Sequence, residues 1–453
     1  MQEFLPLIMF AVICIVLLAG YPVALSLAGV SMLFAFGGSI AGFFDLSLLG
    51  ALPSRVFGTM SNVTLIAVPL FVFMGVTLDK SKIAEELLEN MAKVFGNMRG
   101  GLAFSVVIVG TLLAASTGIV GATVVTMGLM ALPVMLKQNY SASLATGTIA
   151  ATGTLGQIIP PSIALVLLGD ILSTAYQSAQ ISQGIFNPKT VAVGDLFVGA
   201  MVPGIILVLL YLLYLALVSF FNKDAMPQPN TNSSMSIIPL LKGLIPPVLL
   251  IFLVLGSILT GAATPTEAAG VGAFSALCLA AARGQLNLEK LKDITQSSLK
   301  ITSMVFLILI GATVFSLVFR GYGGDELVHS LFTDMPGGKY GALLVVMLAI
   351  FLLGFILDFI EITFVVVPIV APVLLAMGFD PIWLGIMIAV NLQTSFLTPP
   401  FGFALFYLRG VAPDSIATQT IYRGVLPFIA IQLALLIMMA VWPSLVIWLP
   451  NTL

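Results

Sequence analysis

Two consecutive prolines occur twice in this chain, each time inside a long apolar segment. Pro160 and Pro161 stand in the run GQIIPPS, and Pro399 and Pro400 stand in SFLTPPF, 239 residues later. Proline lacks a backbone N–H and clashes with the preceding turn, so each pair must interrupt a helix. Within a membrane, an interrupted helix persists only where protein or a water-filled cavity satisfies its backbone. Two matched interruptions therefore predict the two halves of a transport site, built by internal duplication.

The composition identifies a protein that crosses a membrane several times. Of its 453 residues, 60% are hydrophobic and only 8% are charged, and the mean hydropathy is +1.16. We therefore expect an all-α polytopic membrane protein. The single histidine, His329, excludes a histidine metal site, and no phosphate-binding GxxxxGK[ST] loop occurs. No nucleophile–base pair is visible, so an enzyme is not expected. The net charge of −2 does not indicate a nucleic-acid partner, and none is expected.

The duplication extends well beyond the prolines. At the same spacing Pro133 falls on Pro372, and further upstream Gly100 matches Gly337. Each half should therefore contain the same series of elements. We divide the chain into scaffold helices and a first arm (residues 1–98), transport-domain half 1 (99–180), a connecting span and cytoplasmic linker (181–238), scaffold helices and a second arm (239–338), transport-domain half 2 (339–415) and a final span (416–453).

One segment in each half is too long for a single membrane span. Residues 100–136 carry no charge over 37 positions, whereas a spanning helix needs about 20 residues. This length favours a re-entrant hairpin that enters and leaves on one side, with the small residues Ser116, Thr117 and Gly118 at its tip. Residues 340–379 form the counterpart in the second half. The alternative is an ordinary pair of short spans.

Charge then assigns the sides of the membrane. Five crossings precede the second half, so the two repeats are predicted to have inverted topology. With the linker placed in the cytoplasm, 13 of the 17 Lys and Arg residues lie inside and four lie outside. Such an excess inside is what membrane insertion favours. The four basic residues predicted outside are Arg55, Lys189, Arg320 and Lys339.

The first candidate site joins the first hairpin tip to the first break. Broken helices expose backbone carbonyls, which are hard oxygen ligands suited to a small cation. The alternative is that small residues here only let helices pack closely. Two such clusters at repeat-matched prolines favour ion sites over packing alone. The predicted cation ligands are Ser116, Thr117, Gly118, Gly153, Gly156, Ile159 and Pro161.

The second candidate site joins the second hairpin tip to the second break. Carboxylates at membrane depth are costly and usually functional, so Asp358 and Glu361 could bind a cation, a proton or a polar substrate. Alternatively, Asp358 caps the hairpin's second helix with Glu361 three residues on, and both roles can hold together. The predicted cation ligands are Leu357, Asp358, Ser395, Thr398 and Pro400. The predicted substrate contacts are Asp358, Glu361, Asn391, Gln393 and Thr394.

Two other polar segments have structural explanations. The run TPTE, residues 264–267, predicts a capping box with Pro265 at the first helical position. Residues 80–99 form an amphipathic arm predicted to lie along the membrane, and residues 324–335 are its weaker counterpart.

Taken together, these motifs resemble the large membrane subunit, of the DctM type, of tripartite ATP-independent periplasmic (TRAP) transporters. The matching runs are AASTG (114–118), GQIIPPS (156–162), ATPTEAAG (263–270) and NLQTSFLTPPFGFALF (391–406). The resemblance implies a multi-pass protein of the bacterial inner membrane with an elevator mechanism. In that mechanism a transport domain, holding both hairpins and both broken helices, slides against a scaffold. It also implies Na+ coupling, with about two Na+ sites at the hairpin–break junctions.

The resemblance further implies two protein partners. One is a small four-helix membrane subunit, and the other is a soluble periplasmic substrate-binding protein that delivers the substrate. Substrates in the family are mostly organic acids. Sialic-acid members of the family carry an arginine in the second hairpin, whereas residues 357–362 here contain no basic residue. The resemblance therefore implies 2-oxo acids, dicarboxylates, similar small carboxylates or polyols over sialic acid. The alternatives are a Na+-coupled carboxylate transporter that works without a binding protein, and a channel.

Overall fold

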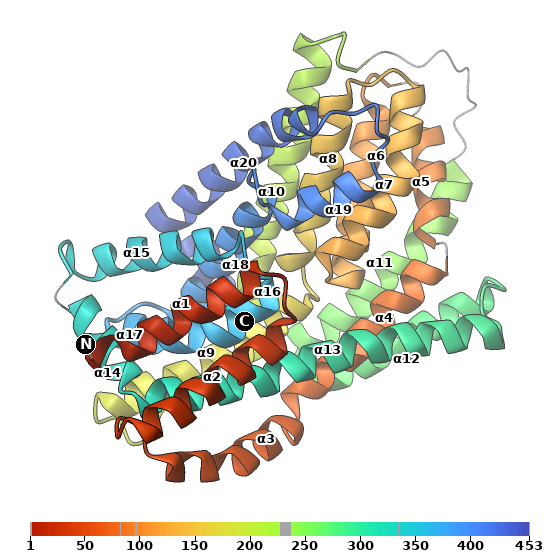
Figure 1. The fold of residues 1–453 in the computed structure, drawn as a ribbon. Helices are drawn as coiled ribbons and strands as arrows, with labels where there is room; N and C mark the ends of the chain where they lie inside the picture. The colour runs from red at the N-terminus through yellow and green to blue at the C-terminus, as the bar shows by residue number, and fades with distance from the viewer. Residues whose placement is uncertain (1, 82, 96–97, 227–236, 334, 453) are drawn as a thin grey trace. The chain divides into compact units, whose positions relative to one another are not determined.

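The computed structural model describes residues 2–81, 83–95, 98–226, 237–333 and 335–452. Within these ranges every regular element is a helix, which confirms the all-α prediction (Figure 1). Six of the described helices are long and apolar enough to cross a membrane, or up to eight if each of two bent pairs forms one span. The polytopic character is therefore confirmed.

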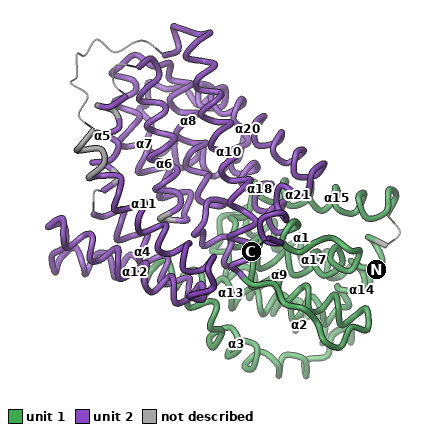
Figure 2. The backbone as a smooth tube through the Cα atoms, turned by 180° about the vertical axis from the view of Figure 1, so that it is seen from behind, with its two compact units in different colours: residues 1–66, 167–192, 300–384 green, residues 67–166, 193–299, 385–453 purple. Residues whose placement is uncertain are grey.

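The chain forms two compact units, coloured separately in Figure 2. Unit 1 contains residues 1–66, 167–192 and 300–384, and unit 2 contains residues 67–166, 193–299 and 385–453. These boundaries cut across the two predicted transport-domain halves. The predicted transport domain and scaffold are defined by which helices move together during transport, so this division stays a prediction.

Unit 1 is built from the N-terminal helices and the second hairpin region. Helices α1 and α2 pack together, and α14 packs against α15 and α17. Its elements are η1 (Gln2–Phe4), α1 (Leu5–Leu18), α2 (Val23–Ile40), η2 (Leu46–Ala51), α3 (Leu52–Met60), η3 (Thr64–Ile66), α14 (Gly324–Thr333), α15 (Gly338–Leu353), α16 (Phe359–Val365) and α17 (Val367–Ala376), with the larger parts of α9 (Ile163–Ser182) and α13 (Leu288–Gly321).

Unit 2 is built around α8, in which every residue from Leu144 to Thr154 is buried. Helices α6, α7 and α20 pack directly against it. The elements of unit 2 are α4 (Ala67–Lys80), α5 (Ile83–Val94), α6 (Gly101–Thr117), α7 (Val120–Lys137), α8 (Ala142–Thr154), η4 (Leu155–Gln157), α10 (Val193–Phe221), α11 (Ile237–Leu259), α12 (Pro265–Ala282), α19 (Phe403–Val411), α20 (Thr418–Val441) and α21 (Ser444–Ile447), with most of α18 (Pro381–Leu397).

The order of helices repeats along the chain, as the duplication predicts. Helices α5 to α8 precede the first proline pair, and α14 to α18 precede the second in the same order. Gly100 and Gly337 occupy matching positions, and each caps its hairpin's first helix in the left-handed conformation, with φ of 78° and 91°. Both Pro-Pro peptide bonds are cis. The opposite orientation of the repeats stays a prediction.

Local sequence signals explain two of the polar segments. In α5, Ile83, Leu87 and Met91 are buried, while Glu85 and Glu86 are exposed, as the amphipathic pattern predicts. At the start of α12 the Thr264 hydroxyl accepts a hydrogen bond from the Glu267 N–H, and the Glu267 carboxylate accepts one from the Thr264 N–H. The predicted capping box is therefore confirmed.

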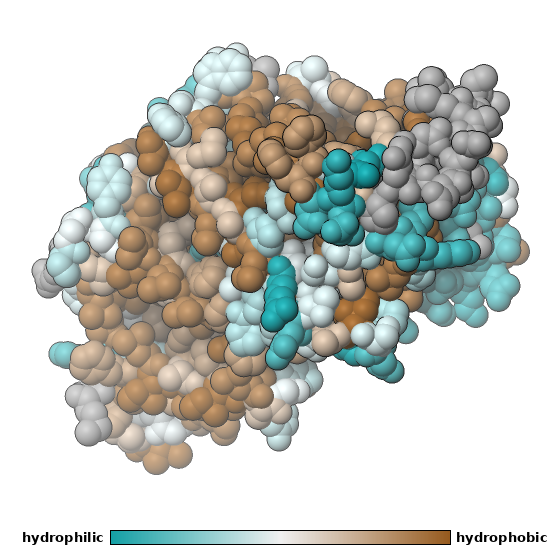
Figure 3. Space-filling model, turned by 90° about the horizontal axis from the view of Figure 1, so that it is seen from above, coloured by the Kyte–Doolittle hydropathy of each residue, from teal (hydrophilic) through white to brown (hydrophobic). Residues whose placement is uncertain are grey.

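Large apolar side chains cover much of the surface. Leu33 and Ile40 on α2 are 72% and 91% exposed, and Phe252 on α11 is 70% exposed. Figure 3 shows hydrophobic side chains over wide areas of the face in view. Such continuous apolar surface is unfavourable in water and suits contact with lipid.

Candidate functional site

The first predicted hairpin is a pair of helices joined by a two-residue turn. Helix α6 ends at Thr117, and Gly118 follows in the left-handed conformation with φ 62°. Ile119 is extended, and α7 begins at Val120. Glycine adopts positive φ at little cost, which explains why it stands at this turn. Helices α6 and α7 pack against each other, so the hairpin geometry is confirmed, and its re-entry into the membrane stays a prediction.

The hairpin turn lies against the first proline break. A Cβ built on Gly156 would be 3.2 Å from the Ala114 carbonyl oxygen and 3.6 Å from the Gly118 carbonyl carbon. A Cβ built on Gly118 would be 3.1 Å from the Ile163 nitrogen, just after the break. Gly118 and Gly156 are thus brought together as predicted, in backbone-to-backbone contact.

The other predicted residues of the first site have different surroundings. A Cβ on Gly153 would be 2.2 Å from Cγ2 of Val124 on α7, so this glycine serves helix packing. The Ile159 side chain contacts Gly204 on α10. Pro161 is buried at the break. The side chains of Ser116 and Thr117 lie outside the described part of the structure.

The second hairpin carries a capping box at its turn. The Asp358 carboxylate accepts a hydrogen bond of 2.7 Å from the Phe359 N–H, and the Glu361 carboxylate accepts one of 2.9 Å from the Asp358 N–H. Leu357 and Glu361 are buried, at 2% and 7% exposed. The capping interpretation of both acids is therefore confirmed. A bend of 57° between α16 and α17, at Val366, was not expected from the sequence.

The remaining predicted residues belong to α18 and the second break, in unit 2. Asn391, Gln393, Thr394 and Ser395 are all buried, at 5% exposed or less. The Thr394 hydroxyl donates to the Val390 carbonyl at 2.8 Å, in its own helix. Buried hydroxyls of this kind keep free lone pairs on the oxygen.

At the break itself, the Thr398 hydroxyl donates to the Thr394 carbonyl at 2.7 Å. The Pro400 carbonyl accepts a hydrogen bond of 3.1 Å from the Tyr422 hydroxyl, and Pro400 is exposed. Leu357, Asp358 and Glu361 belong to unit 1, whereas the predicted residues of α18 and the second break belong to unit 2.

A buried polar network that the sequence analysis missed lies in unit 2. The Gln393 amide donates to the Thr154 hydroxyl at 3.3 Å, and the Gln432 amide donates to the Tyr211 hydroxyl at 2.7 Å and to Thr154 at 3.4 Å. Thr154 and Gln393 are 239 residues apart, which makes them equivalent positions of the two repeats. The two halves therefore meet at this network.

Three amide oxygens in the same unit lack a partner among the described residues: those of Gln157, Gln393 and Gln432. A buried amide oxygen without a hydrogen bond is costly, so each is available to an ion, a water or a ligand. A signal for Gln432 was present in the sequence, because a lone glutamine in an apolar span is unusual.

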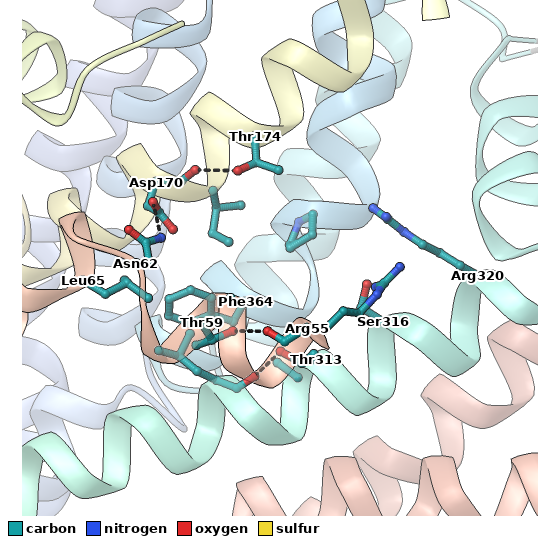
Figure 4. A pocket seen from close by; sticks show the side chains of 15 residues that line it. Arg55, Thr59, Asn62, Leu65, Asp170, Thr174, Thr313, Ser316, Arg320 and Phe364 are labelled. Carbon is teal, nitrogen blue, oxygen red and sulfur yellow. Dashed lines mark hydrogen bonds between the residues drawn. The ribbon is translucent and has the colours of Figure 1, made fainter. Parts of the chain in front are cut away.

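Unit 1 contains a polar cavity of about 360 Å³ that was also missed (Figure 4). Its polar lining comes from three segments that are far apart in the sequence. The Asn62 amide donates to the Asp170 carboxylate at 2.9 Å, and Arg320 forms an ion pair of 3.1 Å with Asp325. The polar side chains that line the cavity are Arg55, Thr59 and Asn62 from α3 and the turn after it, Asp170 and Thr174 from α9, and Thr313, Ser316 and Arg320 from α13.

Comparison with known proteins places these features in a family. Residues 8–445 match the family model for the DctM component of tripartite ATP-independent periplasmic transporters. The C4-dicarboxylate TRAP transporter large permease protein DctM of Pseudomonas aeruginosa is 30% identical over 411 residues, covering 90% of this chain and 91% of that protein. The sialic acid TRAP transporter large permease protein SiaM of Vibrio cholerae is 28% identical over 442 residues, covering 96% of each chain.

Among solved structures, the YdaH transporter of Alcanivorax borkumensis has a similar fold. The TM-score is 0.61 at 15% sequence identity, covering 88% of each chain. The match to the family model extends over nearly the whole chain, and the relatives are permease subunits of membrane transporters, not enzymes. The chain therefore belongs to the DctM family, the large permease subunits of TRAP transporters in the bacterial inner membrane.

Proposed function

We propose that this chain is the large subunit of a Na+-driven symporter that imports a small organic acid. Membership of the family supports secondary transport of organic acids. The observation that carries the proposal of Na+ coupling is the contact between the first hairpin turn and the first proline break. At Gly118 and Gly156 two interrupted backbones meet inside unit 2. Carbonyls that leave a helix in this way are suitable ligands for a small cation.

In this proposal each hairpin–break junction binds one Na+. The first site uses backbone oxygens around Gly118 and Gly156. The second uses oxygens of the second broken helix around Thr398. The hairpins and broken helices move together in an elevator motion, and a periplasmic binding protein and a small four-helix subunit complete the system. The C4-dicarboxylate relative supports a small carboxylate as substrate, contacted by Asn391, Gln393 and Thr394.

The first prediction concerns the driving ion. Proteoliposomes that contain this chain with its small subunit should take up radiolabelled succinate or pyruvate only with an inward Na+ gradient and a cognate binding protein. Replacing external Na+ by choline should reduce uptake to the level of empty liposomes. Uptake that ignores Na+ would contradict symport. Uptake that needs no binding protein would favour a transporter that works alone.

The second prediction separates the two roles of Asp358. Asparagine caps helices as well as aspartate, so Asp358→Asn should keep the fold and the thermal stability. If the carboxylate also binds Na+ or substrate, this variant should lose Na+-dependent uptake. Asp358→Ala should lose uptake and also about 1 kcal/mol of stability, because the cap is gone. Full uptake by Asp358→Asn, measured beside its melting temperature, would leave the carboxylate with the capping role alone.

A further inference from the structure

We propose that the cavity in unit 1 is a binding site for a small carboxylate, with Arg55 as the group that holds the carboxylate. This deepens the proposed function by naming an anion site in unit 1, and it does not depend on which ion drives transport. Its charged and hydroxyl-bearing lining lies apart in sequence from both hairpin tips, whereas Phe364 and Pro368 follow the second tip closely. None of its residues was a predicted ligand.

Among the described charged groups that line the cavity, Arg55 is the one whose side chain has neither an ion pair nor a hydrogen bond. Arg320 is paired with Asp325 through the 3.1 Å contact. Asp170 accepts the 2.9 Å hydrogen bond from Asn62, on the left of the view in Figure 4. Arg55 is half-buried, and among the described residues none forms an ion pair with it. A partly buried guanidinium without a direct hydrogen-bond partner is unfavourable, and a carboxylate matches its geometry best.

The other polar groups suit the rest of a small organic acid. The hydroxyls of Thr59, Thr174 and Thr313 each donate to a carbonyl four residues earlier, so their oxygens keep lone pairs that can accept a hydrogen bond. The remaining lining includes apolar side chains such as Leu65, Leu309 and Phe364. Arg55 suits the carboxylate, the hydroxyl lone pairs can accept from a hydroxyl on the same acid, and the apolar wall suits a carbon skeleton that an inorganic anion lacks.

The predicted topology gives the same site a place in import. Membrane insertion disfavours positive charge on the outer side, so basic residues there need a local reason. Lys339 lies over the rings of Tyr340 and Phe379, at 5.3 and 5.4 Å from their centroids. Two of the four basic residues predicted to lie outside, Arg55 and Arg320, line this one cavity. A carboxylate arriving from the periplasm would therefore meet the site before any group on the cytoplasmic side.

The test is direct binding to the purified full-length chain in detergent, at constant Na+ concentration. Sodium succinate, pyruvate and lactate are titrated while the melting temperature is followed, with sodium sulfate and uncharged succinamide as reference compounds. The variants are Arg55→Gln, Arg55→Lys and the matched control Arg423→Gln, an exposed arginine of unit 2. Melting temperatures without additive show whether each variant is folded.

At least one carboxylate should stabilise the wild type and Arg423→Gln with a saturable curve. In Arg55→Gln the half-saturating concentration should rise at least about tenfold, the loss expected for a charge-assisted hydrogen bond, with Arg55→Lys in between. Stabilisation by no carboxylate, equal stabilisation by sulfate or succinamide, or an unchanged Arg55→Gln curve would each overturn the assignment. The binding assay in detergent contains no Na+ gradient. Na+-independent uptake in liposomes would therefore contradict symport without changing the assignment of the carboxylate site.

Discussion

A single methyl group added at Gly424 or Gly147 should strongly destabilise unit 2. A Cβ on Gly424 would lie 2.0 Å from the Ser143 carbonyl oxygen, and a Cβ on Gly147 would lie 2.0 Å from the Gly424 carbonyl oxygen. Helices α8 and α20 therefore cross with their backbones in contact, as small residues allow in membrane proteins. Backbone cannot turn aside as a side chain can. We expect Gly424→Ala and Gly147→Ala each to cost about 3 kcal/mol, at the upper end of overpacking.

The measurement is the melting temperature and the monodisperse fraction of the purified protein. Gly256→Ala is the matched control, because Gly256 is also helical and a Cβ there meets nothing within 4 Å. Alanine favours a helix over glycine, so this control should equal or slightly exceed the wild type. Equal melting temperatures for Gly424→Ala and the control would show that the two helices are not in contact.

Much of the helix pattern could be predicted because it depends on local signals. The apolar runs of α1 and α10 end where polar or turn residues begin, and the charge-free length of residues 100–136 required two short helices joined by a turn. The capping box at Asp358 is likewise a pattern of residues three apart. Features of this kind are set within one or two turns of the chain.

Helix α3 was not predicted, because its sequence is short and mixed. The segment from Leu52 to Met60 contains Arg55, Ser54 and Gly58, and it shows no apolar run of membrane length. It begins after a turn in which the Asp45 carboxylate accepts hydrogen bonds from Ser47. Because α3 was not predicted, Arg55 was not identified as a candidate residue for binding a substrate.

The polar cavity and the buried glutamine network depend on contacts over long sequence distances. Asn62 and Asp170 are 108 residues apart, and Tyr211 and Gln432 are 221 residues apart. Neither pair belongs to a local motif, so no spacing rule could connect them. The repeat relation offered one exception, since Thr154 and Gln393 stand at the duplication spacing and touch. A search for polar residues at equivalent repeat positions would have found that pair.

Substitutions where the first hairpin turn meets the first proline break should impair transport strongly while the protein still folds. Gly156 lies in the short helix η4, where an added Cβ would be 3.2 Å from the Ala114 carbonyl oxygen. Alanine there should shift the hairpin turn by a few tenths of an ångström, and valine should shift it further, at a cost of about 1–3 kcal/mol. A bound cation requires its oxygen ligands at closely defined distances, so even a small shift should weaken binding.

We therefore expect Gly156→Ala to remain folded, to need a higher Na+ concentration for half-maximal uptake and to transport more slowly, and Gly156→Val to lose Na+-driven uptake. Gly410→Val is the matched control, because Gly410 is exposed on α19 and a Cβ there meets nothing within 4 Å. Melting temperatures separate loss of folding from loss of transport. A folded Gly156→Val protein with the wild-type Na+ dependence would place the first cation site elsewhere. In that case the contact between Gly118 and Gly156 would serve packing alone.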